Sequence, residues 1–368
     1  MKITNIRLRR LRLRLDPPFF AAWDPVPREH FDATIVSIET DEGVIGVGSG
    51  DTMNGFEAYT DLFVGTDPLN IVEQVRRIES LNFHAGRFWP IEVALWDIIG
   101  QTANLPVARL FGGARDKLPA YASTGELRSP QQRAESALAI REAGFQAMKI
   151  RVDAHDPATG LAAVKATRDA VGDSLEIMVD LNQAWRMAGD TQVPHDYAAA
   201  RRLVEELRDL DVYWVEEPLP YADRDGLVRL RRETGARVAA GEMISSVSDV
   251  VDYLERDVLD VYQMDVVLAV GMLRARTLAE LAIHKNRVFT PHSWTNGIGV
   301  LANLHVGAGV GGGPYFEFPY DPPGWTPRRR DFLLRTPVDI DREGFVHVPT
   351  TPGIGAQLDE EACRRWQI

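Results

Sequence analysis

The chain has 368 residues, of which 45% are hydrophobic and 26% are charged, as in ordinary soluble globular proteins. Its net charge of −12 argues against nucleic acid or an anionic membrane surface as a partner. The single Cys363 excludes an internal disulfide framework and a cysteine-based zinc site. No apolar run approaches the ~18 residues of a membrane helix, and the N-terminus lacks a signal peptide's apolar core, so we expect a cytoplasmic protein.

Residues 1–115 are predicted to form a small α+β domain. Period-two alternation in ITNIRLRRLRLRL, FDATIVSIET and GVIGVGSG predicts three antiparallel strands, with a hairpin turn at 41–43. Two helices are predicted next, in DPLNIVEQVRRIESL and WPIEVALWDIIGQTANL. Asp67 and Pro68 are expected to open the first of them.

Residues 116–325 change to an alternation of short apolar runs and amphipathic stretches. The runs are PAYAS, AMKIRV, LEIMVD, VYWVEE, ARVAAGE, VYQMDV, RVFTPH and YFEFP. Eight strand–helix units predict a (β/α)₈ barrel, a fold of roughly 250 residues. The long stretch between LEIMVD and VYWVEE is expected to be a lengthened loop before its helix. Residues 326–368 have hairpin character and are expected to return to the first domain.

Three acidic residues, Asp180, Glu216 and Glu242, lie at the carboxyl ends of predicted barrel strands. A parallel barrel gathers these ends into one ring, where three carboxylates would repel one another unless a cation held them. Oxygen ligands without cysteine or histidine suit Mg²⁺. The sequence therefore predicts a magnesium site at the mouth of the barrel.

Other polar residues end the remaining strands. Lys149 and Arg151 share one face of the second strand, and Asp265, His292 and Glu317 follow on the sixth, seventh and eighth. Taken singly, each could be a helix cap, an ion-pair partner or a hydrogen-bonded loop residue. Together they lie on the face where barrel enzymes carry their active sites, which favours a catalytic function.

The ordered set Lys-x-Arg, DLNQAW, WVEEP, AAGE, QMD, TPHSW and a final Glu resembles the enolase superfamily, in its mandelate racemase and muconate lactonizing enzyme branch. The resemblance implies a modified (β/α)₈ barrel with an α+β N-terminal capping domain, one Mg²⁺ and a homo-oligomer. It also implies abstraction of a proton α to a carboxylate. Asp180, Glu216 and Glu242 match the metal ligands, and His292 matches the base of a His-Asp pair with Asp265. That pair is typical of the mandelate racemase-like subgroup.

The resemblance further implies that Glu317 hydrogen-bonds the substrate carboxylate, with Lys149 and a protonated Glu317 stabilising the enediolate. Arg151 stands where many relatives have a second lysine base. A neutral arginine at pH 7 costs roughly 7.5–9 kcal/mol, which disfavours a two-base racemase. We therefore expect a one-base dehydratase that converts an acid sugar or hydroxy acid to a 2-keto-3-deoxy product. A racemase, epimerase or cycloisomerase, and a metal- and carboxylate-binding protein without turnover, remain alternatives.

Two capping loops, around 17–31 and 49–59, are expected to set the specificity for a small-molecule carboxylate. The predicted substrate contacts are Phe20, Trp23, Asn182, Trp294 and Thr295. The alternative for each loop aromatic is packing against the barrel rim.

Overall fold

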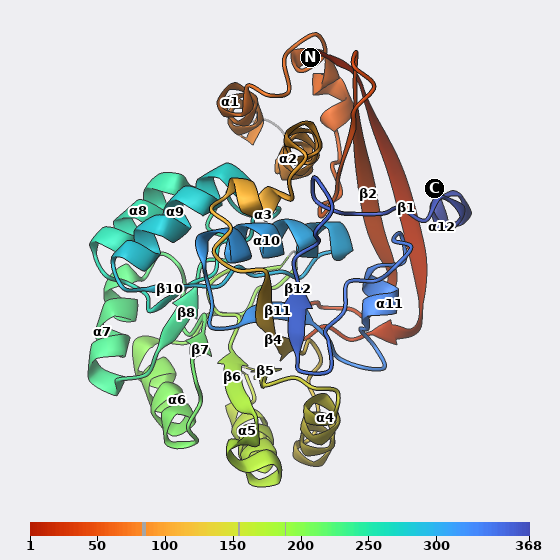
Figure 1. Ribbon diagram of the computed structural model, residues 1–368. Coiled ribbons are helices and arrows are strands. Elements are labelled where there is room, and N and C mark those ends of the chain that lie inside the picture. The colour runs from red at the N-terminus through yellow and green to blue at the C-terminus, as the bar shows by residue number, and fades with distance from the viewer. Residues whose placement is uncertain (83–85, 154, 188) are drawn as a thin grey trace.

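The computed structural model describes residues 1–82, 86–153, 155–187 and 189–368 as a capping domain beside a barrel (Figure 1). The capping elements are β1 (Ile3–Phe19), β2 (Arg28–Thr40), β3 (Ile45–Gly48), the 3₁₀ helix η1 (Phe56–Leu62), α1 (Ile71–Asn82), α2 (Trp89–Ala103) and α3 (Val107–Leu110). The first three strands form an antiparallel sheet in the order β1-β2-β3, which confirms the predicted strands and their hairpin turn.

Helix α2 lies directly on β3, and glycines make this approach possible. A Cβ added at Gly46 would lie 2.1 Å from the Ala94 carbonyl oxygen, and one at Gly48 would lie 2.0 Å from that of Pro90. Any larger residue would push the helix off the sheet. The GVIGVGSG run is therefore both a strand and a docking surface for α2.

Two details of the capping domain differ from expectation. Leu69 N–H donates to the Asp67 carboxylate at 3.0 Å, so residues 67–70 form a turn and α1 begins only at Ile71. Strand β1 continues through Pro17 to Phe19, which pairs with Arg28 at the start of β2. The loop expected at 17–31 is thereby reduced to 20–27.

All eight predicted barrel strands are present, which confirms the barrel fold class. They are β4 (Lys117–Ser123), β5 (Ala147–Arg151), β6 (Glu176–Asp180), β7 (Val215–Glu216), β8 (Val238–Ala240), β9 (Val261–Tyr262), β10 (Val288–Phe289) and β11 (Phe316–Pro319). They pair in parallel in the order β10-β9-β8-β7-β6-β5-β4-β11. Between β10 and β11 the Thr290 hydroxyl donates to the Tyr315 carbonyl oxygen, and Gly313 N–H donates to that of Phe289 at 2.9 Å.

Helices cover the outside of this sheet. They are α4 (Pro130–Glu142), α5 (Pro157–Val171) with the short η2 (Gly172–Ser174), α6 (Tyr197–Asp209), α7 (Arg224–Thr234), α8 (Val247–Glu255), α9 (Met272–His284) and α10 (Gly297–Val310). Side chains that accept a hydrogen bond from the first helical turn cap six of them: Ser129, Asp156, Asp196, Asp223, Ser246 and Asn296. The expected long loop precedes α6.

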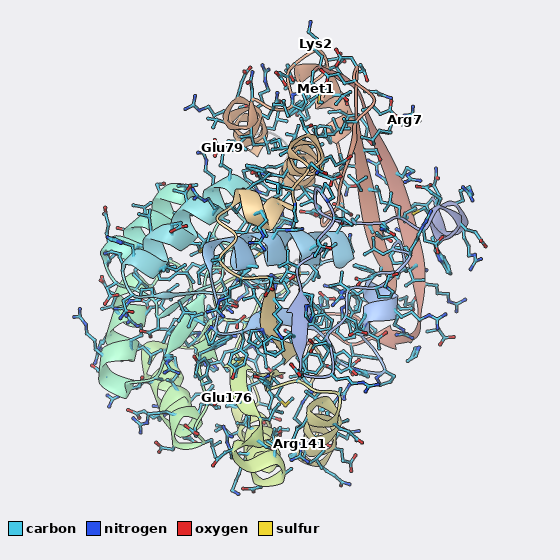
Figure 2. The ribbon with its side chains drawn as sticks, viewed as in Figure 1. Met1, Lys2, Arg7, Glu79, Arg141 and Glu176 are labelled. Atoms are coloured by element: carbon cyan, nitrogen blue, oxygen red, sulfur yellow. The ribbon has the colours of Figure 1, made fainter. Side chains whose placement is uncertain are left out.

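The barrel strands run toward the capping domain. Figure 2 labels Met1 and Lys2 at the top of the capping sheet and Glu176, the first residue of β6, in the lower half of the molecule. Asp180 ends β6, and Asn182, two residues further on, lines one cavity together with Trp23 and Arg28 of the capping domain. Among the described residues, no helix combines the length and apolarity needed to cross a membrane.

A buried glutamate joins the two parts. Glu92 of α2 accepts hydrogen bonds from Met272 N–H (3.0 Å) and Leu273 N–H (2.7 Å), the first amides of α9, and from the Trp96 indole. Burial raises the pKa of Glu92 to about 7, although these three donors oppose the rise. Glu92 thus caps a barrel helix from the capping domain.

The last segment contains α11 (Pro327–Arg330), β12 (Phe345–His347) and α12 (Glu360–Trp366). Strand β12 pairs antiparallel with β4 of the barrel. Near the C-terminus, Ile368 N–H donates to the Arg10 carbonyl oxygen at 3.0 Å, and Glu360 lies 2.6 Å from Arg9. These contacts with β1 support our proposal that residues 326–368 return to a capping domain of residues 1–115 after a barrel of residues 116–325.

Candidate active site

The three predicted carboxylates lie together at the mouth of the barrel. Asp180 and Glu216 are the last residues of β6 and β7 and pair in register, while Glu242 follows β8 through Gly241. Each offers one oxygen within 4.8 Å of the others, and the three side chains are almost completely buried. The strand ends position them, because parallel strands of a barrel finish at the same edge.

This carboxylate cluster fits a divalent cation. Burial and the charge of Glu216 raise the pKa of Glu242, although the nearby His292 opposes this. Within the described part of the chain, Glu242 Oε2 accepts no hydrogen bond. Buried carboxylate oxygens this close together are stable only with compensating positive charge, and an all-oxygen donor set matches the preference of Mg²⁺.

Two cations of β5 lie beside the carboxylate cluster, as their shared strand face predicts. Lys149 Nζ lies 2.6 Å from Glu216 Oε1, 2.8 Å from Glu317 Oε1 and 3.5 Å from Asp180 Oδ2. Arg151 contacts Asp180 and donates to the Thr124 carbonyl oxygen at 3.0 Å. Lysine therefore occupies the centre of the site and arginine its edge.

His292 and Asp265 form a buried pair on the other side of the site. His292 Nδ1 lies 2.9 Å from Asp265 Oδ2, and Nε2 lies 3.2 Å from Glu242 Oε2. Burial lowers the pKa of His292, but the charges of Glu242 and Glu317 outweigh it and raise the pKa to about 10. Asp265 is itself held by Val267 N–H at 2.7 Å.

The surroundings of Glu317 favour the ionised carboxylate over the protonated form that the family resemblance implies during the reaction. Its carboxylate accepts hydrogen bonds from the Ser123 hydroxyl and from Ser293 N–H, both at 2.7 Å, and it contacts Lys149. Burial raises the pKa of Glu317, but the charges of Lys149, His292 and Arg151 outweigh it and lower the pKa below its usual range. A carboxylate surrounded by donors gains nothing from carrying its own proton.

A cavity of about 180 Å³ opens above these groups. Three of the predicted substrate contacts, Trp23, Asn182 and Trp294, line it together with nine further residues: Arg28, Arg87, Arg151, Trp185, Met187, Glu242, Met243, Leu268 and His292. A second cavity of about 340 Å³ shares four of these walls, namely Trp23, Asn182, Trp185 and Met187. Tryptophans therefore form walls of this candidate substrate cavity, and Arg28 and Arg87 of the capping domain also line it.

Phe20 and Thr295 are not among the residues that line this cavity. Successive residues of a strand point to opposite faces, so Phe19 is fully buried while Phe20, just past the end of β1, is 58% exposed. Thr295 is buried, and a Cβ added at Gly299 would lie 2.1 Å from its hydroxyl oxygen. Met53 and Phe56 of the second loop pack into the core of the capping domain, which neither the substrate-contact interpretation nor packing against the barrel rim anticipated.

Family comparison agrees with this geometry. Residues 132–362 match the model of the enolase C-terminal domain-like family, and residues 4–112 match that of the mandelate racemase / muconate lactonizing enzyme N-terminal domain. The two matches cover most of the chain. The chain belongs to the mandelate racemase and muconate lactonizing enzyme family of the enolase superfamily.

Similar proteins catalyse several reactions. D-galactarolactone cycloisomerase of Agrobacterium fabrum is 27% identical over 100% of this chain and 99% of its own length. L-talarate/galactarate dehydratase of Salmonella typhimurium is 27% identical over 90% of this chain and 81% of its own length. A racemase from Streptomyces coelicolor with bound magnesium has a TM-score of 0.84 at 26% identity, with both chains fully covered. The family therefore defines the fold, and the reaction depends on the particular residues of the site.

Proposed function

We propose that the protein is a Mg²⁺-dependent enzyme that removes the proton α to a carboxylate and dehydrates an acid sugar or hydroxy acid. Asp180, Glu216 and Glu242 would hold the metal ion. When bound, Mg²⁺ supplies positive charge that offsets the carboxylate cluster and the negative charge that develops on the substrate oxygens. The magnesium-bound structure and the dehydratase among the similar proteins support this proposal.

The observation that carries the proposal is the asymmetry of the site. His292 offers a ring nitrogen on one side, with Asp265 behind it. On the other side, Arg151 is occupied by Asp180, by the Thr124 carbonyl oxygen and by Asn182 Oδ1 at 3.2 Å. Racemisation needs a proton acceptor on each face of the α-carbon, whereas a dehydration needs one base that can return its proton.

The His292–Asp265 pair would set which nitrogen reacts. Asp265 Oδ1 accepts from Val267 N–H and from Asn303 Nδ2 (3.2 Å), so Oδ2 remains for His292 Nδ1–H. Nε2 lies 3.2 Å from Glu242 Oε2, so the ring would be neutral once a bound cation offsets the charge of Glu242. The hydrogen bond to Asp265 then assigns the ring hydrogen to Nδ1 and leaves the Nε2 lone pair to accept a proton. Asp265 thereby orients the base and increases its basicity.

Lys149 would act on the substrate carboxylate. Its ammonium group lies between Glu216 and Glu317 and is completely buried, so its charge is little screened by solvent. As the α-proton moves to His292 Nε2, negative charge develops on the carboxylate oxygens of the substrate. A fixed ammonium group near those oxygens stabilises the transition state more than the ground state.

Elimination completes the reaction. The electron pair released at the α-carbon forms the C2–C3 double bond as the β-hydroxyl leaves, and protonated His292 gives its proton to that hydroxyl to form water. The enol product tautomerises to the 2-keto-3-deoxy acid. A single histidine would thus serve as base and then as acid, on the same face of the substrate.

A cycloisomerase is the second candidate. It is favoured by the cycloisomerase from Agrobacterium fabrum, whose alignment covers this whole chain, and it also requires only one base near the α-carbon. In that reaction an oxygen of the substrate leaves the β-carbon while remaining attached to the molecule through another bond.

A screen of acid sugars, hydroxy acids and sugar lactones with Mg²⁺ tests the proposal. We expect loss of water and a 2-keto product from at least one acid sugar or hydroxy acid. Ring opening of a lactone without loss of water would identify a cycloisomerase. Inversion at the α-carbon would identify an epimerase or racemase. Calorimetric binding of carboxylates without conversion, even at high enzyme concentration, would leave a protein that binds but does not turn over.

A further inference from the structure

The two carboxylate oxygens of Glu216 have different surroundings. Oε1 faces Lys149 Nζ at 2.6 Å, in the carboxylate cluster. Oε2 accepts hydrogen bonds from Gln263 Nε2 at 2.8 Å and from Trp214 Nε1 at 3.2 Å. All four residues are completely buried, so water does not compete for these bonds.

The fold holds both donors rigidly. Trp214 stands two residues before Glu216 and therefore shares its face of the strand, and its ring packs edge-on against Tyr121 with centroids 5.4 Å apart. Gln263 follows β9; its N–H donates to the Ala240 carbonyl oxygen at 3.0 Å, and its own carbonyl oxygen accepts from His292 N–H at 3.1 Å. Strand β8 lies between β7 and β9, so the Gln263 side chain reaches across the barrel interior to Glu216.

The orientation of the Gln263 amide indicates that its function is to hold the Glu216 carboxylate. A carboxylate can only accept hydrogen bonds, so the amide must present its NH₂ group to Oε2. Its own Oε1 atom is then left without a partner among the described residues, in the buried interior of the barrel. Burying an unpaired amide oxygen is unfavourable, and a hydrocarbon side chain of similar size would avoid it.

We propose that Trp214 and Gln263 are positioning residues that fix the Glu216 carboxylate by holding Oε2, so that Oε1 stays in the carboxylate cluster, where a divalent cation would bind. Both donors are neutral, so they orient the carboxylate without cancelling the charge that attracts the metal. Neither is placed to touch the substrate, and both act through Glu216. Partners of this kind behind a metal ligand commonly change metal affinity by 10–100-fold.

Metal affinity in the absence of substrate tests this inference independently of the proposed reaction. We expect Gln263→Leu and Trp214→Phe each to weaken Mg²⁺ binding by roughly 10–100-fold in titration calorimetry, with a parallel loss for Mn²⁺ in electron paramagnetic resonance. Gln74→Leu is the matched control. Gln74 is an equally buried amide with an unpartnered Oε1, but it lies in the capping domain and donates to Thr66 and Asp67. Its variant should bind Mg²⁺ like the unmodified protein.

The inference is overturned if Gln263→Leu and Trp214→Phe bind Mg²⁺ within about twofold of the unmodified protein. It is also overturned if Gln74→Leu weakens binding as much as they do, since the effect would then reflect general loss of packing. Melting of each variant without metal shows which are folded. Trp214→Phe retains most of the apolar ring surface and removes only the indole donor, so it decides the question if Gln263→Leu does not fold.

Discussion

Replacing Glu92 with glutamine should change how the stability of the protein depends on pH. Glu92 is completely buried, and its pKa is raised to about 7 from an ordinary 4.5. Between pH 4.5 and 7 the folded protein retains a proton on Glu92 that the unfolded chain has released. The free energy of unfolding therefore falls as pH rises through this window, and Glu92→Gln removes that part of the fall.

The size of the effect follows from the pKa difference. At roughly 1.36 kcal/mol for each pKa unit, raising the pKa from 4.5 to about 7 corresponds to about 3 kcal/mol in total. About 2.5 kcal/mol of this should be lost between pH 5 and pH 8. The amide cannot accept from Met272, Leu273 and Trp96 at once, so the variant also loses about 1 kcal/mol at every pH.

Urea unfolding at several pH values between 5 and 8 measures both effects. The free energies of unfolding of the two proteins should converge, or reverse in order, as pH rises. Glu135→Gln on the exposed face of α4 is the control, since Glu135 is solvent-exposed and, within the described residues, accepts a hydrogen bond from Gln131 one turn earlier. Parallel pH profiles for Glu92→Gln and the unmodified protein would show that Glu92 is ionised throughout, and would refute the reasoning.

Three further outcomes concern the site. Trp23→Ala should raise KM roughly tenfold (~1.4 kcal/mol), because Trp23 lines the cavity and its ring packs on that of Trp294 with centroids 4.9 Å apart. Phe20→Ala is the control: Phe20 is exposed, so KM should stay within about twofold. Asp265→Asn should lower kcat by about 100-fold or more with little change in KM, because the amide no longer fixes the His292 tautomer; an unchanged kcat would remove Asp265 from the mechanism. Dialysis against a chelator should abolish turnover and added Mg²⁺ should restore it, and activity that survives complete metal removal would contradict the metal-dependent reaction.

The fold was predictable because its signals are periodic. Eight apolar runs with helices between them specify a barrel. Its parallel strands bring Asp180, Glu216 and Glu242 to one edge, independently of the conformation of the loops. The extent of β1 was harder to predict, because Pro17 and Pro18 suggest a loop. The strand nevertheless continues to Phe19. Because side chains along a strand alternate between its two faces, Phe19 is buried and Phe20 points to solvent.

The chemistry between strands was less accessible from the sequence. The hydrogen-bond donors around Glu317 come from three separate strands or loops: Ser123, Lys149 and Ser293. In the sequence, Trp214 and Gln263 are ordinary residues of the runs VYWVEE and VYQMDV. Nothing in either run indicates that both side chains donate hydrogen bonds to Glu216 Oε2.

Arg28 and Arg87 of the capping domain line the cavity without any local motif to indicate it. Arg28 stands at the start of β2, beyond the shortened first loop, and a lone arginine there looks like any surface residue.

Turnover in D₂O, followed by nuclear magnetic resonance, tests the central claim that His292 removes an α-proton during dehydration. The unmodified protein with Mg²⁺ should convert its acid substrate to a 2-keto product that carries deuterium at C3, the carbon that is protonated when the enol tautomerises. His292→Asn should give neither product nor exchange while still binding Mg²⁺. Deuterium at the α-carbon of recovered substrate without a keto product would contradict the dehydration. Undiminished turnover by His292→Asn would contradict the assignment of the base.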